Sequence, residues 1–393
     1  MPIVCLATLQ ALLSVTTTTG TIMAQVNAKN TYLHAILSLN KILYMKLPNY
    51  FKEFISLPSD LAEIKQQGEN IVLHLWQPLY GSKQGAHKFY KYLVGIVKSI
   101  GYMVSNHDPS VYYWLSTNGT FTVIASATDD MTMISDSNKT SNKLQDEFGK
   151  DLEIVKLGPI HWLLGMSVTR DLEKHTISLS QEAYIDTIVN CLGLNNAQPA
   201  TTPIETNVDL TIGLPHISST LLTPTEKTHY REGIGSVMYA LMTHPNIAFA
   251  IGILSQHLKC PTTTHIEALR YVMCYLKGTK EFTLTLGGDS DEFIAFTDSD
   301  YTSHSHHRSI SGYACYLGSS STILWMSKKQ PLVMLSLTEA KYIAITQASK
   351  KVIWLCHLFT KIPFLFPIFN TPTLLYRDNQ DAIWLAQNAI YHV

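Results

Sequence analysis

The sequence predicts a mixed chain of the α+β and α/β classes, built from more than one domain. Its 393 residues exceed the roughly 100–200 residues of a typical domain. Apolar strands flank an acidic turn in the first half, and the last quarter alternates strands and helices. Hydrophobic residues make up 46% of the chain and charged residues 15%, which is ample for a buried core and excludes disorder.

The first block, residues 1–155, is expected to mix helices and strands. Apolar residues at helical spacing or in unbroken runs predict helices over 3–15, 85–100 and 139–149. The segments 121–126 and 131–135 are apolar and β-branched, and an acidic turn at 128–130 separates them. Two short strands joined by such a turn predict a tight hairpin.

Two further blocks follow. Residues 156–228 hold a predicted hairpin near 160–180 and a short helix over 182–191, and they end in a Thr/Pro-rich stretch typical of an extended linker. Residues 229–288 are expected to be helical, with helices over 230–255 and 264–277.

From residue 289 the pattern changes to βββαβα. Strands are predicted over 293–298, 309–317, 322–327 and 373–376. Helices are predicted over 338–359, which carries an apolar stripe, and 381–387. This order is typical of an antiparallel sheet that a parallel strand extends through a helical crossover.

Composition narrows the functional classes. A net charge of −1 argues mildly against a nucleic-acid binder but does not exclude a local basic groove. No apolar run reaches the ~18–20 residues of a membrane helix, and no signal peptide is evident, so we expect an intracellular chain with no membrane partner. The six scattered cysteines form no C-x-x-C motif and are expected to be free thiols. The histidine cluster at 304–307 fits no zinc spacing and is expected to be a loop.

The acidic turn is a candidate metal site. Asp129 and Asp130 are adjacent carboxylates, whose charges repel unless a cation lies nearby. Mg²⁺ prefers carboxylate and phosphate oxygens, and two-metal phosphoryl transfer uses such pairs. The alternative is an ordinary solvated turn, because aspartate is a common turn residue.

Short motifs in a fixed order support the first interpretation. They include 43–48 (L-Y-M-K-L-P), 79–84 (L-Y-G-S-K-Q), 157–159 (L-G-P), 179–181 (L-S-Q), 235–239 (G-S-V-M-Y), 275–279 (Y-L-K-G-T), 309–313 (S-I-S-G-Y), 327–330 (S-K-K-Q) and 378–380 (D-N-Q). In this order they closely resemble the reverse transcriptase and RNase H region of copia-type LTR retrotransposon Pol polyproteins, almost from end to end. The resemblance implies a polymerase palm with part of the fingers over 1–155, a thumb-like segment with a linker over 156–228, a helical connection over 229–288 and a C-terminally truncated RNase H-like domain over 289–393.

The resemblance assigns roles to particular residues. The family's Y-V-D-D box falls on 127–130, so Asp129 and Asp130 would be catalytic metal ligands. Lys83, Gln84 and Gly85 would line the incoming nucleotide, although the start of a helix is the structural alternative. The family implies two Mg²⁺ per active site, with Mn²⁺ as an alternative, and the partners RNA template, DNA primer and RNA/DNA hybrid. It also implies a cytoplasmic particle or the nucleus as the location.

One palm residue departs from the family. The third metal ligand, an aspartate in the family, is Asn27 here. An amide offers one neutral oxygen where a carboxylate offers two and a full charge. We therefore expect polymerase turnover to be lost or reduced by orders of magnitude. The chain begins shortly before this residue, so the upstream fingers are expected to be absent.

The RNase H-like carboxylates are also incomplete. Asp298 and Asp378 match the first and third catalytic metal ligands. The second falls on Lys341, with Glu339 as the fallback, and the fourth would lie beyond Val393. A lysine would put a positive charge where a cation binds. Asp300 is expected to be a solvated neighbour.

The departures share a pattern. Several residues differ from the one that the family has at the same position, and each difference can arise by one G-to-A transition in the codon. These residues are Asn27, Asn246, Lys341, His87, His244 and Thr31. The sequence therefore indicates a decayed, inactive copy of the element. A second reading is a catalytically dead nucleic-acid-binding remnant, in which Lys83, Lys88, Lys91 and Lys98 still meet phosphates or form a solvated face. A third is an unrelated α/β protein with an incidental Asp-Asp turn.

Overall fold

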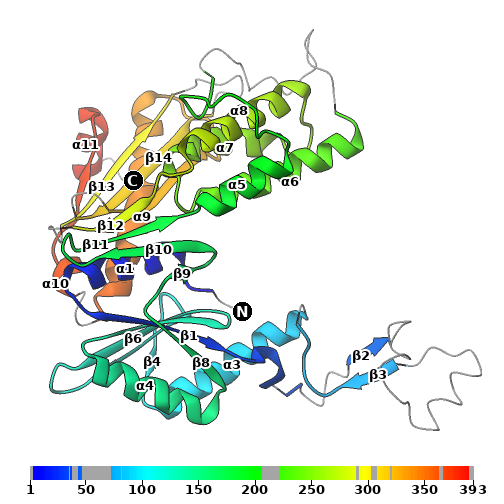
Figure 1. The fold of residues 1–393 in the computed structure, drawn as a ribbon. Coiled ribbons are helices and arrows are strands. Elements are labelled where there is room, and N and C mark those ends of the chain that lie inside the picture. Colours follow the sequence, from blue (N-terminus) through cyan, green and yellow to red (C-terminus); the bar gives the residue numbers. More distant parts are fainter. Residues whose placement is uncertain are drawn as a thin grey trace, which may run out of the picture. The chain divides into compact units, whose positions relative to one another are not determined.

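The computed structural model describes most of the chain as helices, strands and ordered connections (Figure 1). The described residues are 3–34, 36–37, 43–46, 72–80, 82–205, 222–288, 292–301, 308–318, 321–362 and 366–388. The chain divides into two compact units, one of which contains Met23–Ser105 and Pro109–Pro159. The other contains Cys5–Ile22 and Ile160–Val393. The mixed α/β class with several sheets is confirmed.

The first unit is built on a six-stranded sheet of order β4-β5-β6-β7-β1-β8. Its strands are β1 (Ile22–Ala28), β4 (Met103–Val104), β5 (Val111–Leu115), β6 (Phe121–Ala127), β7 (Asp130–Ser135) and β8 (Ile154–Gly158). The remaining elements of this unit are η1 (Thr31–His34), the strand pair β2 (Leu43–Lys46) and β3 (Val72–Leu75), α3 (Lys83–Ser99) and α4 (Asn138–Asp151). The predicted hairpin is confirmed as β6 and β7.

The core of this unit explains the apolar run in β6. Every residue of β6 except the last is buried, so both faces of the strand are covered and its apolar residues do not alternate with exposed polar ones. Phe89 of α3 and Phe148 of α4 are fully buried in the same hydrophobic cluster as Ile124 and Met133 of the hairpin strands. The two helices thereby fix the hairpin whose turn carries Asp129 and Asp130.

The second unit holds a sheet of order β12-β11-β10-β9 and the helix α1 (Leu6–Thr18). The strands are β9 (Trp162–Leu163), β10 (Met166–Asp171), β11 (Thr176–Ser180) and β12 (Leu284–Gly287). Helix α1 packs on β11 and β12, although these strands follow more than 150 residues later in the sequence. Asp108 anchors its start, because Oδ2 of Asp108 accepts hydrogen bonds from the Cys5 backbone N–H at 3.0 Å and the Thr8 hydroxyl at 2.9 Å.

A helical cluster follows in the same unit. It consists of α5 (Glu182–Cys191), α6 (Pro224–Ala240), η3 (Pro245–Ile247), α7 (Ala248–Leu254), η4 (Ser255–His257) and α8 (Thr263–Thr279). The prediction of one helix over 230–255 is wrong, because α6 ends at Ala240 and the short η3 separates it from α7. Pro245 occupies the start of η3, where the missing N–H of proline is tolerated, whereas a helix interior would not accept it.

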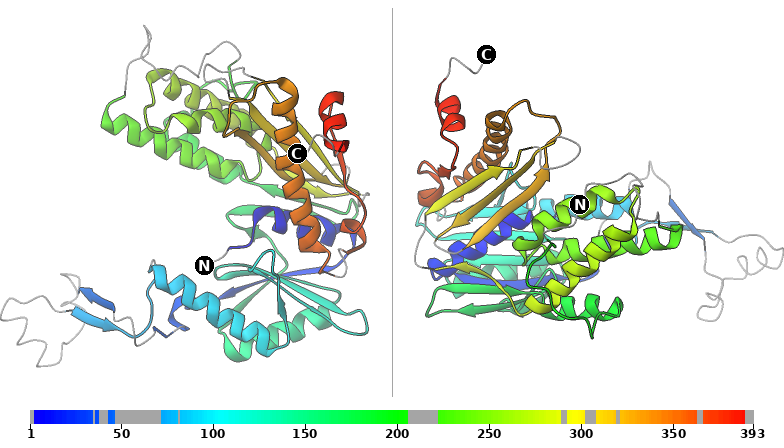
Figure 2. Two further views of the ribbon diagram at one scale, coloured as in Figure 1. Left: turned by 180° about the vertical axis from the view of Figure 1, so that it is seen from behind. Right: turned by 90° about the horizontal axis from the view of Figure 1, so that it is seen from above.

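The last sheet has the order β15-β14-β13-β16. Its elements are β13 (Phe293–Ser299), β14 (Ile310–Leu317), β15 (Thr322–Lys329), α9 (Leu337–Phe359), α10 (Phe366–Phe369), β16 (Leu374–Tyr376) and α11 (Gln380–Gln387). The strands β13, β14 and β15 are antiparallel, and β16 pairs with β13 in parallel. Helix α9 packs along β13 and β14 (Figure 2). The predicted order βββαβα is found except for the short helix α10, which lies between α9 and β16 and was not predicted.

Burial of His244 gives a pH dependence of stability. Its side chain is 1% exposed, with Nε2 3.1 Å from the Thr279 carbonyl oxygen and Nδ1 2.9 Å from the Thr243 hydroxyl. Desolvation lowers the pKa of His244, partly offset by the Thr279 hydrogen bond. The folded chain thus resists protonation that the unfolded chain accepts below about pH 6.5, so stability falls as pH drops through that value.

We expect His244→Gln to reduce this loss, because glutamine keeps hydrogen-bonding groups but does not titrate. The measurement is the Tm of both proteins between about pH 7.5 and 5.5. Equal slopes of Tm against pH would show that His244 is not the group that titrates.

Candidate functional site

The acidic residues of the first half lie at the tip of the β6–β7 hairpin. Thr128 adopts a left-handed conformation with φ of 63°, which lets the chain reverse between the two strands. Asp129 occupies the turn and Asp130 begins β7. Both carboxylates are half-buried.

Strand β1 brings Asn27 to this hairpin. It is the neighbour of β7 in the sheet, and the Ala28 backbone N–H donates to the Asp129 carbonyl oxygen at 2.8 Å. The Asn27 side-chain Nδ2 donates to Oδ1 of Asp130 at 2.9 Å. The two distant stretches of sequence that were expected to form one site therefore meet side chain to side chain.

An aromatic group borders the acidic turn. Tyr32 of η1 makes an edge contact with Tyr80 at 4.7 Å between ring centroids and with Phe89 at 6.4 Å. Burial raises the pKa of Tyr32, and the charge of Asp129 raises it further. The sequence motifs did not single out Tyr32, although it lies only five positions after Asn27.

The segment expected to line a nucleotide is the start of α3. Lys83 is the first residue of this helix, and Gln84 is half-buried in its first turn. The Ser82 hydroxyl caps the helix by accepting from the Gly85 backbone N–H at 3.2 Å. A Cβ at Gly85 would lie 3.2 Å from Pro78 Cβ and 3.3 Å from the Tyr32 ring, so close packing alone accounts for this glycine. Through Tyr32, the start of α3 adjoins the acidic turn.

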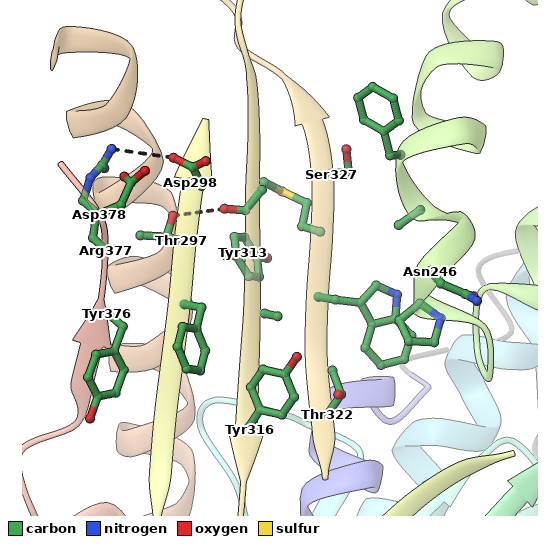
Figure 3. Close-up of a pocket in the computed structure, with 18 residues that line it drawn as sticks. Asn246, Thr297, Asp298, Tyr313, Tyr316, Thr322, Ser327, Tyr376, Arg377 and Asp378 are labelled. Atoms are coloured by element: carbon green, nitrogen blue, oxygen red, sulfur yellow. Dashed lines mark hydrogen bonds and ion pairs between the residues drawn. The ribbon is translucent and has the colours of Figure 1, made fainter. Parts of the chain in front are cut away.

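A second acidic pair lies at one edge of the last sheet. Phe296 of β13 pairs with Tyr376 of β16, so Asp298 and Asp378 lie two residues further along parallel neighbouring strands. Figure 3 shows their side chains close together, next to Arg377. The carboxylates are well exposed, at 64% and 69% of the side chain.

Lys341 of α9 bridges this pair. Its Nζ lies 2.8 Å from Asp378 Oδ1 and 3.2 Å from Asp298 Oδ1. Burial disfavours the charged form of Lys341, but hydrogen bonds and charges from the two aspartates outweigh it and raise the pKa of Lys341. The hydrogen bond from Lys341 in turn lowers the pKa of Asp378.

Arg377 adds a second buried cation. Its side chain is 1% exposed, with a terminal nitrogen 4.0 Å from Asp298 Oδ1, and it donates to the Lys341 backbone carbonyl. Burial lowers the pKa of Arg377, against the pull of both aspartates. Neither the bridge made by Lys341 nor the role of Arg377 was predicted.

Two other candidates have structural contacts of their own. Glu339 lies at the start of α9, where its carboxylate accepts from the Leu335 backbone N–H at 2.7 Å, as a helix cap does. It is Lys341, not Glu339, that reaches the aspartates. Asp300, expected to be a solvated neighbour of the site, accepts a hydrogen bond from the Ile310 backbone N–H. The histidines at 304–307 lie outside the described residues.

A groove of about 940 Å³ runs from the second acidic pair toward η3 and α7. Aromatic side chains line it, and Phe296 stacks on Tyr376 with 5.1 Å between ring centroids. Figure 3 shows Tyr316 and Tyr376 along its sheet wall and Asn246 on the opposite side. The groove thus offers flat apolar surface beside an edge rich in charge.

The two acidic sites differ in how they suit a divalent cation. At the hairpin, Asp129 and Asp130 offer carboxylate oxygens and Asn27 an amide, which are ligand types that Mg²⁺ accepts. At the second pair, the ammonium group of Lys341 lies between the carboxylates, so a positive charge already faces them. Over the described part of the chain, no three His, Cys, Asp or Glu side chains group as a metal site.

Comparisons with known proteins show the family of the chain. Residues 1–206 match the family model described as reverse transcriptase (RNA-dependent DNA polymerase), which covers more than half of the 393 residues. The chain therefore belongs to the reverse transcriptase family. Within it, the chain is a member of the copia-type retrotransposon Pol polyproteins, as its relatives show.

Two such relatives come from plants. The chain is 30% identical over 392 residues to the retrovirus-related Pol polyprotein from transposon TNT 1-94 of Nicotiana tabacum, covering 100% of the chain and 28% of that protein. It is 28% identical over 370 residues to the Pol polyprotein from transposon RE1 of Arabidopsis thaliana, covering 94% of the chain and 23% of that protein. The chain thus spans about a quarter of the length of these relatives. Among the helices that the structure describes, none is long and apolar enough to cross a bilayer.

Proposed function

We propose that the unit around the six-stranded sheet is the palm of an RNA-directed DNA polymerase, and that this copy is catalytically silent. The observation that carries the proposal is the contact of Asn27 with Asp130, 2.9 Å apart, beside Asp129. Three positions from two distant segments converge where the neighbouring strands β1 and β7 and the β6–β7 turn meet, as a phosphoryl-transfer site requires. RNA template and DNA primer would be the substrates, inferred from the family.

Asp129 and Asp130 would hold two Mg²⁺ ions, or Mn²⁺. The bound metal would neutralise charge on the nucleotide phosphates during transfer. The protein side chains would hold and orient the metal, so their total charge would determine the affinity for the metal. Lys83, Gln84 and Gly85 would place the nucleotide at the start of α3, which adjoins the acidic turn through Tyr32.

Asn27 accounts for the proposed lack of polymerase activity in the palm. Its Nδ2 donates to Asp130, so the side chain presents a hydrogen-bond donor where a metal ligand would present negative charge. The site then holds two negative charges instead of three. Metal-borne charge stabilisation is worth several kcal/mol in such reactions, and about 1.4 kcal/mol is a factor of ten in rate.

We further propose that the last sheet with α9 and α11 is RNase H-like and would face an RNA/DNA hybrid. Its βββαβα order, interrupted only by the short helix α10, and the parallel β13–β16 pair support this assignment. Asp298 and Asp378 occupy matching positions at one edge. The family's location, a cytoplasmic particle or the nucleus, remains a prediction from the resemblance.

A second candidate is a remnant that binds nucleic acid without chemistry. Lys88, Lys91 and Lys98 are spaced by three and seven residues, which puts them on one face of α3. Lys91 and Lys98 are exposed. A basic helical face beside the acidic turn could meet phosphates even where Asn27 prevents turnover.

Filter binding of an RNA/DNA template–primer across a salt titration tests both readings. We expect binding without nucleotide incorporation, and the Lys91→Glu/Lys98→Glu variant should weaken binding and flatten the salt dependence by about two units of slope. The matched control is Lys139→Glu/Lys150→Glu on exposed positions of α4. Absence of binding by the unmodified chain would contradict the proposed function.

A further inference from the structure

We propose that the ammonium group of Lys341 takes the place of a divalent cation between Asp298 and Asp378. The acidic edge of the last sheet would then be a permanent ion-pair cluster that binds no metal. The expectation of a metal at this edge rests on the proposed RNase H-like assignment. The cluster itself rests only on contacts described above.

The distances leave no room for both Lys341 Nζ and a Mg²⁺ ion between the two carboxylates. Nζ of Lys341 lies 2.8 Å from one carboxylate oxygen and 3.2 Å from the other. Mg²⁺ bound by both carboxylates would need oxygens at about 2.0–2.1 Å. A cation shared by these two oxygens must therefore lie in the space that the ammonium group fills.

Packing keeps Lys341 in this position. Its side chain is only 10% exposed, whereas the aspartates are 64% and 69% exposed. Its neighbours on α9, Ala340 and Ala344, are buried against the sheet. Arg377 binds its backbone carbonyl. Releasing the ammonium group to solvent would require part of α9 to move.

The charges of the cluster also argue against binding of a divalent cation. Two carboxylates face two cations, Lys341 and Arg377, so the cluster is neutral and has no net attraction for a divalent ion. Lys341→Glu would leave three carboxylates against Arg377 alone, a net charge that matches one divalent cation. This single substitution should convert the ion-pair cluster into a metal site.

The test is Mn²⁺ titration of the full chain by electron paramagnetic resonance. It uses an Asp129→Asn/Asp130→Asn background, so that the palm does not contribute. In this background, Lys341→Glu should bind Mn²⁺ at least about tenfold more tightly than the parent, since affinity follows ligand charge. The gain should vanish on adding Asp298→Asn. Lys350→Glu, the same charge change at an exposed position of α9, should show no gain.

Thermal unfolding supplies a second readout. Lys341→Glu should have a lower Tm than the parent in EDTA, because three carboxylates repel, and Mg²⁺ should restore it. The parent Tm should not respond to Mg²⁺. No gain in Mn²⁺ affinity for Lys341→Glu would overturn the proposal.

If Lys341→Glu does not fold, a measurement that leaves Lys341 unchanged still tests the proposal. The parent background should bind Mn²⁺ identically with and without Asp298→Asn. A loss of Mn²⁺ binding on Asp298→Asn would show that a metal enters beside Lys341, and the proposal would be wrong. These readouts are metal affinity and Tm, so they are independent of template–primer binding, on which the proposed function depends.

Discussion

Asn27→Asp is expected to raise Mg²⁺-dependent primer extension by about a hundredfold or more over the unmodified chain. The new carboxylate would lie 2.9 Å from Asp130, where the amide now donates a hydrogen bond. It would add a negative charge and a second oxygen to the metal ligands. A gain of about 3 kcal/mol in transition-state stabilisation corresponds to this factor. The measurement is single-turnover extension of a primer on an RNA template.

Two controls make the result specific. Asn27→Asp combined with Asp130→Asn restores the count of two carboxylates and should return extension to the level of the unmodified chain. Asn27→Asp alone should also lower the Tm in EDTA and recover it in Mg²⁺, because it brings like charges together. Equal extension by Asn27→Asp and the unmodified chain would show that Asn27 is not the sole defect.

Gly287→Ala is expected to be among the most destabilising substitutions in the chain, by about 3 kcal/mol or more. Gly287 ends β12 with φ of 94°, a conformation that other residues rarely adopt. A Cβ there would overlap the His175 carbonyl oxygen and the Thr17 hydroxyl. The Ser321 hydroxyl also donates to the Gly287 carbonyl at 2.9 Å, so the backbone cannot shift freely.

Gly20→Ala is the matched control. Gly20 has φ of 67° but no atom within 4 Å of an added Cβ, so only the backbone conformation resists alanine there. We expect its cost to be about 1 kcal/mol. Chemical denaturation of both variants measures the difference. Equal losses would show that the crowding around Gly287 relaxes.

Local patterns predicted much of the fold. The hairpin of β6 and β7 follows from its apolar and β-branched residues on either side of an acidic turn. The short helix α5 was also predicted. The convergence of Asn27 on the hairpin was expected from the family resemblance, since nothing in the local sequence of β1 indicates its neighbour. Strand pairing between segments a hundred residues apart depends on tertiary packing, which composition and periodicity do not encode.

The cluster at Lys341 shows what local patterns leave open. Motif alignment left Lys341 and Glu339 as alternatives, and only the contacts of Glu339 with Leu335 and of Lys341 with the aspartates separate them. The sequence did contain a sign that Lys341 has a charged partner. Lys341 lies three and seven positions before Ala344 and Ala348, on the buried stripe of α9. A lysine on an apolar stripe is rarely left without a charged partner. The sequence around Arg377 gave no comparable sign that its side chain is buried beside the aspartates.

The assignment of α1 to the second unit has a consequence for biosynthesis. The ribosome releases this apolar helix before its packing partners β11 and β12, which follow more than 150 residues later in the sequence. Until then, buried positions such as Leu9, Leu12 and Leu13 have no native surface to cover them. During this time, the nascent chain must shield α1 in another way or rely on chaperones. A shortened chain that stopped near residue 160 would leave that segment uncovered permanently and would favour aggregation.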